Sequence, residues 1–495
     1  MTNPSSGFLA NVLKLVTGSI VAQAVAILVT PIVTRLFAPE PFGIAALFTS
    51  IVTVISVVSC LRYELAIMLP KTDEEAANIL SVSVCSVVII SAVTALFFFL
   101  AGDVIANALN APKLKIYLWM LPLAVLSKGL FLAFNFWDSR MKRFGQLSFV
   151  RVVSSLTTQT TKVGAGFAGH VSGGVLIGTN VLGYVVSASM LGGQIWRDNH
   201  QLLKGNIRWK NMLEEVVRYK EFPIYSTWAI LLETTSHQLA PLFLAIFFSS
   251  GVVGFFALGL RVLSFPIRLI GQAIGQVFFQ KAAEVQHKGQ LNEVVKEVFQ
   301  RMISLGMFPF LLLALLGKDL FSFVFGSQWA EAGVYIQMLS LWIFFVFILT
   351  PLSNLFSVLE VQKEGFYCNL SLFLSRAISL SIGGILGSPR LAIALFSVVG
   401  TVGSSWMCLW ILYKAKVSVT TSTAILARYL LLSLPFLGII GGGHYLLELH
   451  VLYTLGMSVL CSIFYYGVVI YQDVHIRTQL FILLEKKLSG RKDLT

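Results

Sequence analysis

Apolar residues follow one another in long runs along most of the chain, and short polar stretches separate the runs. A helix needs roughly 20 residues to cross the hydrocarbon core of a bilayer. Runs of this length can be drawn at 10–34, 43–61, 79–101, 116–137, 146–168, 173–196, 222–248, 251–279, 299–325, 332–357, 366–387, 391–413, 426–447 and 451–472. The pattern therefore predicts an all-α polytopic membrane protein with about 14 transmembrane helices.

The longest stretch without a predicted span follows the sixth of them. Its MLEEVVRY portion separates apolar from charged residues and is predicted to form an interfacial helix. We place the domain boundaries around this stretch. They give an N-terminal lobe at 1–200, a cytoplasmic linker at 201–221, a C-terminal lobe at 222–415, two further spans within 416–472 and a cytoplasmic tail at 473–495.

The two lobes resemble each other weakly. The segment PIVTRLFAPEPFGIAALF, which begins at Pro31, is similar to PLFLAIFFSSGVVGFFAL, which begins at Pro241, and Gly43 then corresponds to Gly254. Chance similarity between apolar strings is the alternative. Because six spans per lobe is an even number, the two copies have the same orientation. Such parallel repeats occur in transporters, with the substrate path between the repeats.

Composition and charge agree with a membrane protein. Hydrophobic residues make up 56% of the chain and charged residues only 12%, whereas soluble domains have about 25% charged residues. This balance excludes a soluble enzyme and a disordered chain. The net charge of +13 comes largely from loops, because 25 of the 36 Lys and Arg residues fall on one predicted side and five on the other. The positive-inside rule then places both termini in the cytoplasm.

Other classes of site find little support in the sequence. No loop is large enough for a nucleic-acid-binding module, so no nucleic acid partner is expected. The five cysteines are scattered without a CxxC pair, and no histidines have metal-ligand spacing. We therefore expect no metal and no catalytic residue.

Several charged residues fall inside predicted spans, where an ionised group costs roughly 2.5–3.5 kcal/mol. Such residues are expected to face a wet cavity or a partner. The cationic ones are Lys128, Arg151, Lys162, Arg261, Arg268 and Arg376. We expect these six to line a hydrophilic cavity and to bind a phosphate or diphosphate through charge-assisted hydrogen bonds. Snorkelling to the interface is the alternative for Arg151 and Arg268.

Hydroxyl residues and an acid–histidine pair complete the predicted cavity. The span that holds Arg151 and Lys162 also carries the polar run SSLTTQTT, which suits a helix that lines a wet lumen. Glu233 and His237 lie four residues apart, on one helix face, and are candidates for coupling to H⁺ or Na⁺. A plain ion pair for Glu233 and a packed role for His237 are the alternatives. No other cofactor is expected.

The segment TRLFAPEPFGIAALFTSI resembles the first hairpin of bacterial polysaccharide flippases. These are the Wzx-type O-antigen and exopolysaccharide translocases of the multidrug/oligosaccharidyl-lipid/polysaccharide exporter superfamily. The residues that supply the motif are Arg35, Phe37, Pro39, Glu40, Phe42 and Gly43. The following RYELAIMLPKTDEEAANIL is similar to the family's next connection. The resemblance implies two six-helix lobes in a V shape and two C-terminal helices. A turn that is only structural is the alternative role for the motif.

The resemblance also implies a function and a location. It implies transport of polyprenyl-diphosphate-linked oligosaccharides across the bacterial inner membrane by alternating access, for O-antigen (lipopolysaccharide) or exopolysaccharide biosynthesis. Its partners would be this lipid-linked oligosaccharide, membrane lipids, a polysaccharide polymerase and other export machinery. Transport requires no covalent chemistry, so an enzyme is not expected. The alternatives are a peptidoglycan lipid precursor flippase, a multidrug exporter of the same fold and a membrane polysaccharide polymerase.

Overall fold

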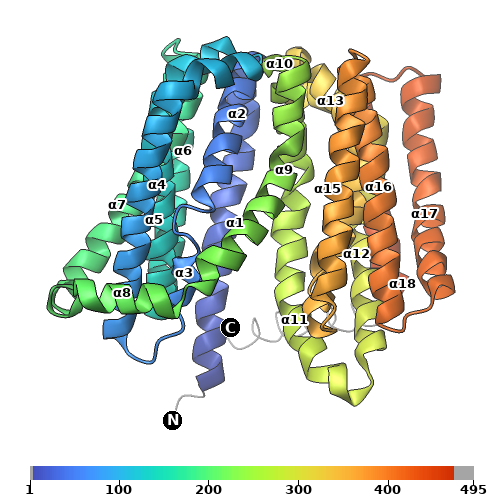
Figure 1. Ribbon diagram of the computed structural model, residues 1–495. Coiled ribbons are helices and arrows are strands. Elements are labelled where there is room, and N and C mark those ends of the chain that lie inside the picture. The colour runs from blue at the N-terminus through green and yellow to red at the C-terminus, as the bar shows by residue number, and fades with distance from the viewer. Residues whose placement is uncertain (1–3, 473–495) are drawn as a thin grey trace, which may run out of the picture. The chain divides into compact units, whose positions relative to one another are not determined.

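The computed structural model describes residues 4–472, with side chains from residue 17 onward except that of His287. All regular structure in this range is helical (Figure 1). The longer helices are α1 (Pro4–Leu36), α2 (Pro39–Ser56), α4 (Asp73–Ala108), α5 (Leu121–Arg140), α6 (Phe144–Phe167), α7 (Gly173–Asn206), α8 (Trp209–Arg218), α9 (Thr227–Phe247), α10 (Ser250–Leu263), α11 (Gln272–Val285), α12 (Leu291–Phe325), α13 (Ala330–Leu352), α15 (Gln362–Ile385), α16 (Pro389–Lys414), α17 (Val419–Gly441) and α18 (Val451–Gln472). The predicted tail at 473–495 lies outside the described residues.

Short helical segments join these helices. They are α3 (Tyr63–Ala66), η1 (Pro112–Met120), η2 (Phe222–Ser226), η3 (Ile267–Gly271), η4 (Gln286–Lys288), η5 (Ser327–Trp329), α14 (Leu355–Val358) and η6 (Gly442–Leu446). The segments η2, η3 and η6 are π-helical turns, which commonly mark functional positions or places where a helix changes direction.

The predicted all-α membrane fold is confirmed. Within residues 4–472, 13 helical segments are long and apolar enough to cross a membrane. Each of the 14 predicted spans coincides with a helix. The span that lacks the required apolarity is 146–168. It forms α6, a helix of 24 residues whose hydroxyl and charged side chains lower its hydropathy.

Helix ends follow local rules of the sequence. Thr72 precedes α4 in an extended conformation, and its hydroxyl accepts a hydrogen bond from the backbone N–H of Glu75. Three acidic residues then occupy the first turn of α4, where the helix dipole favours negative charge. Pro39 opens α2, where its fixed φ suits the first helical position.

The contacts of the described residues divide the chain into two compact units. The first comprises residues up to Val262 together with Val324–Tyr335 and Asn369–Phe396. The second comprises Leu263–Phe323, Ile336–Cys368 and the residues from Ser397 onward. These units are defined by contacts, whereas the lobes at 1–200 and 222–415 are defined from the sequence. The lobes therefore stay a prediction.

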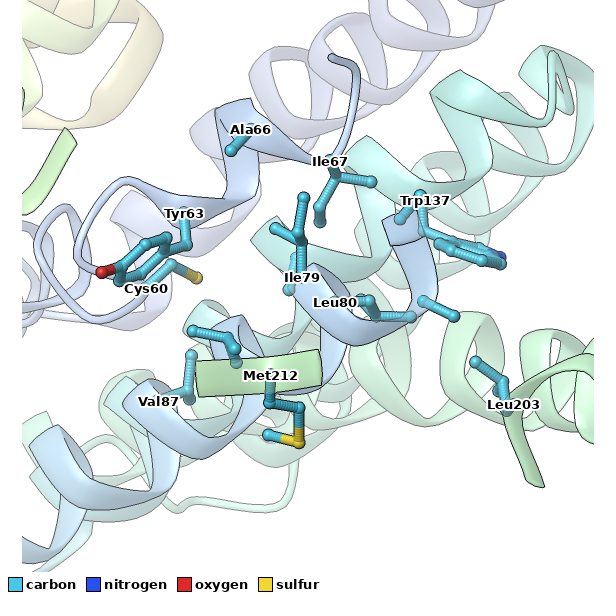
Figure 2. Close-up of a cluster of buried hydrophobic side chains, with 14 of the residues drawn as sticks. Cys60, Tyr63, Ala66, Ile67, Ile79, Leu80, Val87, Trp137, Leu203 and Met212 are labelled. Carbon is cyan, nitrogen blue, oxygen red and sulfur yellow. The ribbon is translucent and has the colours of Figure 1, made fainter. Parts of the chain in front are cut away.

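One end of the first unit is closed by a hydrophobic cluster, shown in Figure 2. Met212 on α8 belongs to this cluster, as do Val87 on α4 and Trp137 on α5, and the Tyr63 hydroxyl donates to the Val216 carbonyl at 3.3 Å. The stretch MLEEVVRY is thus a helix as predicted. In Figure 1, α8 runs across the lower end of α4.

In the second unit, the hairpin of α17 and α18 is held against α12. Pro309 lies inside α12 and has no N–H, so the carbonyl of Leu305, four residues earlier, lacks its helical donor. The Tyr466 hydroxyl of α18 donates to this carbonyl at 2.9 Å, and the neighbouring Tyr465 hydroxyl donates to the Ser304 carbonyl at 3.0 Å. The hairpin therefore satisfies a backbone group that the proline leaves free within the membrane.

Candidate functional site

Lys162 is the most unusual of the predicted cavity residues. It lies near the end of α6, and its side chain is 5% exposed. Among the described residues, no hydrogen-bond acceptor or carboxylate pairs with its ammonium. Arg261 of α10 is instead close enough for the two positive charges to repel each other. A buried cation without a counter-charge is costly, so this position suits an anion supplied from outside the chain.

Tyr184, which sequence analysis did not predict as a site residue, lies near both Arg261 and Lys128. Lys128 of α5 donates to the Thr53 hydroxyl at 2.9 Å, and its Nζ lies 5.7 Å from the centre of the Tyr184 ring. The charge of Arg261 also acts on Tyr184. Tyr184 lies on α7 and interrupts a run of small and apolar residues, VLGYVVS, which is the only signal the sequence offers. Lys128 and Arg261 therefore both lie near Tyr184, and Lys162 lies near Arg261; we call these four residues the cation group.

Arg151 has a different environment on the same helix as Lys162. Its guanidinium donates to the Ser19 hydroxyl of α1 at 2.6 Å and to the Asn135 side-chain oxygen of α5 at 3.2 Å. These bonds join three helices and occupy donors that a substrate would otherwise use. A role of Arg151 in substrate binding stays a prediction.

Glu233, His237 and Arg376 come together within the first unit. The charges of Glu233 and Arg376 both act on His237. Arg376 of α15 is 9% exposed and lies 5.9 Å from the centre of the Phe396 ring. Glu233 and Arg376 thus lie close enough to His237 for their opposite charges to act on it, and the plain ion-pair interpretation of Glu233 stays open. Coupling to H⁺ or Na⁺ at Glu233 and His237 stays a prediction.

Arg268 differs from the other five predicted cations because it belongs to the second unit. It lies on the π-helical turn η3, directly after Pro266, and its side chain is exposed. The place of Arg268 in a cavity stays a prediction.

The turn motif between α1 and α2 packs against a segment nearly 300 residues away in sequence. The Thr34 carbonyl, at the end of α1, accepts hydrogen bonds from the side chains of Gln328 and Trp329, each at 2.8 Å. Phe42 packs edge-on against the Trp329 ring, with 4.9 Å between ring centres. The end of α1 therefore finds its missing donors in this segment.

The other motif residues have separate roles. Phe37 is completely buried, and Glu40 forms an ion pair with Lys113 at 2.9 Å. Arg35 is exposed and its side chain lies beside Gly326, which has a positive φ of 106°. Pro39 opens α2 as described above. These contacts favour a structural role for the turn.

Gly43 has a reciprocal contact with the repeat partner that the sequence predicts. A Cβ at Gly43 would collide with the Ser250 carbonyl at the start of α10, and a Cβ at Gly254 would collide with the Pro39 carbonyl at the start of α2. Gly43 and Gly254 are 211 positions apart, as are Pro39 and Ser250. The two helix starts thus meet in the pseudo-two-fold way that a parallel repeat produces. We call these four residues the glycine seam.

Comparison with known proteins identifies the family. A family model described as "Polysaccharide biosynthesis protein" matches residues 32–334, which is more than half of the chain. The chain belongs to this family. No curated protein matches this polysaccharide biosynthesis protein at a significant level.

Solved structures show the same fold. The chain is similar to the lipid II flippase MurJ in an inward closed conformation, with a TM-score of 0.71 and 13% identity over 94% of this chain and 99% of that one. It is similar to an inward-facing multidrug resistance MATE family transporter of the MOP superfamily, with a TM-score of 0.62 and 15% identity over 80% and 96%.

A third likeness is to a MOP superfamily transporter from Pyrococcus furiosus, described as having a binding pocket of reverse polarity. The TM-score is 0.51, with 14% identity over 82% of this chain and 95% of that one. At these identities the likeness concerns the fold alone. The chain is therefore a multi-pass membrane protein whose fold is similar to that of these transporters.

Proposed function

We propose that this polysaccharide biosynthesis protein is a flippase for polyprenyl-diphosphate-linked oligosaccharides in the bacterial inner membrane. The observation that carries the proposal is Lys162, a buried ammonium without a counter-charge that faces Arg261. A diphosphate supplies two to three negative charges and several acceptor oxygens, and so provides Lys162 with the counter-charge that its surroundings lack. No covalent step is part of this function.

The other members of the cation group fit the same head group. Lys128 keeps one hydrogen bond to Thr53 and has further N–H groups to offer to a phosphate oxygen. The Tyr184 ring lies next to it and offers a flat surface of the kind on which sugar rings stack. Hydroxyl groups of α6 donate to backbone carbonyls, as Ser154 does to Gly183 and Ser155 does to Ala22, and their oxygens can still accept hydrogen bonds from sugar hydroxyls.

The glycine seam supports transport by alternating access. By the predicted topology, α2 and α10 start on the outer side of the membrane. Their starts approach closely enough that neither Gly43 nor Gly254 has room for a Cβ. A close contact between two repeat-related helix starts is a natural gate, because it can separate without breaking either helix. Partners such as a polysaccharide polymerase follow from this function and are proposed with it.

The proposed function is tested in cells that lack their own copy of this gene. Wild type should restore surface polysaccharide, which is read on a gel at matched expression. Lys162→Gln should reduce the product at least tenfold, whereas Lys115→Gln, which removes an exposed lysine paired with Asp103, should restore it fully. Full rescue by Lys162→Gln would refute the assignment of Lys162 to the substrate.

Flipping of the peptidoglycan lipid precursor is a second candidate, because the fold matches that of a lipid II flippase over 94% of the chain. That substrate is also a polyprenyl diphosphate, so the cation group suits it as well. Depletion of the cell's own lipid II flippase separates the two functions. Growth supported by this chain would favour the second candidate, and lysis would favour the first. A multidrug exporter is less favoured, because three cations would repel a cationic drug.

A further inference from the structure

A second group of buried charges lies where α5 ends, α6 begins and α7 passes by, and the functions above do not use it. Asp138 belongs to the last turn of α5, and its side chain is completely buried. Neither of its carboxylate oxygens accepts a hydrogen bond from any described residue. An ionised carboxylate in that situation loses its hydration and receives no donor in exchange.

Among the described residues, the cation that acts on Asp138 is shared with another acid. The Arg143 guanidinium lies 3.9 Å from Asp138, too far for a hydrogen bond, and 3.2 Å from Asp198 of α7. Asp198 is also paired with Arg197 at 3.2 Å. The charged groups that act on Asp138 are thus Arg143, which attracts its negative charge, and Asp198, which repels it. Arg143 thus lies closer to Asp198 than to Asp138, and the negative charge of Asp198 favours a proton on Asp138.

Several polar atoms at this end of the three helices are buried and have no hydrogen-bond partner among the described residues. They are Trp137 Nε1, Arg143 Nη1, Gln146 Oε1, Gln194 Oε1 and Asn199 Oδ1. Most of them are acceptors, as are the Asp138 oxygens. A protonated carboxyl group adds one donor to a neighbourhood that is short of donors.

We infer that Asp138 is a proton-binding site, and that its proton is the ion coupled to transport. Arg143 and Asp198 give access to it, because their side chains are 24% and 27% exposed. When the carboxyl group binds a proton, Arg143 is held by Asp198 alone. When it releases the proton, Arg143 is drawn toward both acids.

Binding and release of the Asp138 proton affect α6, the helix that carries Lys162. Arg143 directly precedes α6, whose other end holds the buried ammonium of the cation group. A change in how Arg143 is held therefore biases the position of α6, and with it the site for the anionic head group. This coupling rests on the proposed flippase function, whereas binding of the proton does not.

Infrared difference spectroscopy tests proton binding directly. The purified full chain in lipid nanodiscs is compared at neutral and mildly acidic pH, without substrate. Wild type should gain carboxylic-acid absorption on acidification. The component that belongs to Asp138 should be missing in Asp138→Asn and shift without loss in Asp138→Glu, whereas the component of the buried Glu64 should remain. The absorption should stay unchanged in Asp103→Asn, which removes an exposed carboxylate. Absorption in Asp138→Asn equal to that of wild type would overturn the inference.

A transport measurement separates this inference from the function on which it rests. Export by wild type should fall at least fivefold when a protonophore collapses the proton gradient. The residual export by Asp138→Asn should not respond to the protonophore. The Asp138 absorption without any flipping activity would contradict the proposed function, and flipping without that absorption would contradict the proton site alone.

Discussion

Burial makes Glu64 a residue whose ionisation matters for folding. Glu64 lies on α3, between two membrane spans, and its side chain is completely buried beside Arg62, at 3.2 Å. Loss of hydration raises the pKa of this carboxyl group above its usual value, and the nearby Arg62 offsets part of the effect.

The raised pKa predicts a pH dependence of stability with a definite sign. The folded chain holds the Glu64 proton more tightly than the unfolded chain, so protonation stabilises the fold. This contribution is fully present below the pKa of an unfolded Glu and is lost as pH rises through the raised folded pKa. Thermal unfolding of Glu64→Gln should lack this loss. An equal loss in both proteins would show that Glu64 does not cause it.

Residues of the site differ in how far the sequence could predict them. An ammonium or guanidinium inside an apolar run stands out in any sequence, and for that reason Lys128, Lys162 and Arg261 could be predicted. Tyr184 and Asp138 could not, because a tyrosine or an acid near a span end is ordinary until its neighbours are known. The separate role of Arg151 also depends on the register between α1, α5 and α6, which periodicity does not contain.

At the scale of elements, the bend of α12 at Pro309 offers a double-mutant test. Tyr466→Phe should lower the free energy of unfolding by about 1 kcal/mol, because the Leu305 carbonyl loses the donor that takes the place of the missing proline N–H. In a Pro309→Ala background the new N–H serves that carbonyl, so the same change should cost less. Unfolding in detergent measures both values.

The matched control for this test is Tyr453→Phe, which alters an exposed tyrosine on the same helix and should be nearly neutral. Equal costs of Tyr466→Phe with and without Pro309 would show that the hydroxyl does not replace the missing helical bond.

Helices could be predicted from the sequence where a long run of apolar residues marks a membrane span. All 14 predicted spans are helices, including α6, whose polar residues obscure it in any measure of hydropathy. The π-helical turns at η2, η3 and η6 were not predictable, because they follow from local packing and not from periodicity. The contact of Thr34 with Gln328 and Trp329 joins distant segments and has no trace in the sequence pattern.

At the scale of the whole molecule, the glycine seam predicts that added methyl groups disturb transport. Gly43→Ala and Gly254→Ala each place a Cβ against a backbone carbonyl, which cannot move aside as a side chain would. Overpacking of this kind costs on the order of 1–3 kcal/mol. Each variant should therefore weaken the outer contact and reduce export of polysaccharide.

Separation of the two helix starts is measured with a cysteine introduced beside the glycine seam. The rate at which a membrane-impermeant thiol reagent labels this cysteine reports how often the contact opens. Gly193→Ala is the control, since its Cβ would meet nothing within 4 Å. Unchanged labelling and export in both seam variants would show that the contact is not a gate.

The central claim is that a buried, uncompensated cation receives the diphosphate of a lipid-linked oligosaccharide. Its most direct test is flipping of a polyprenyl-diphosphate-linked oligosaccharide in proteoliposomes that contain only this chain. Wild type should translocate the lipid, Lys162→Gln should lose at least nine-tenths of the rate, and Lys162→Arg should retain most of it, because the charge is kept. A Lys162→Gln protein that flips the lipid at the wild-type rate would contradict the claim.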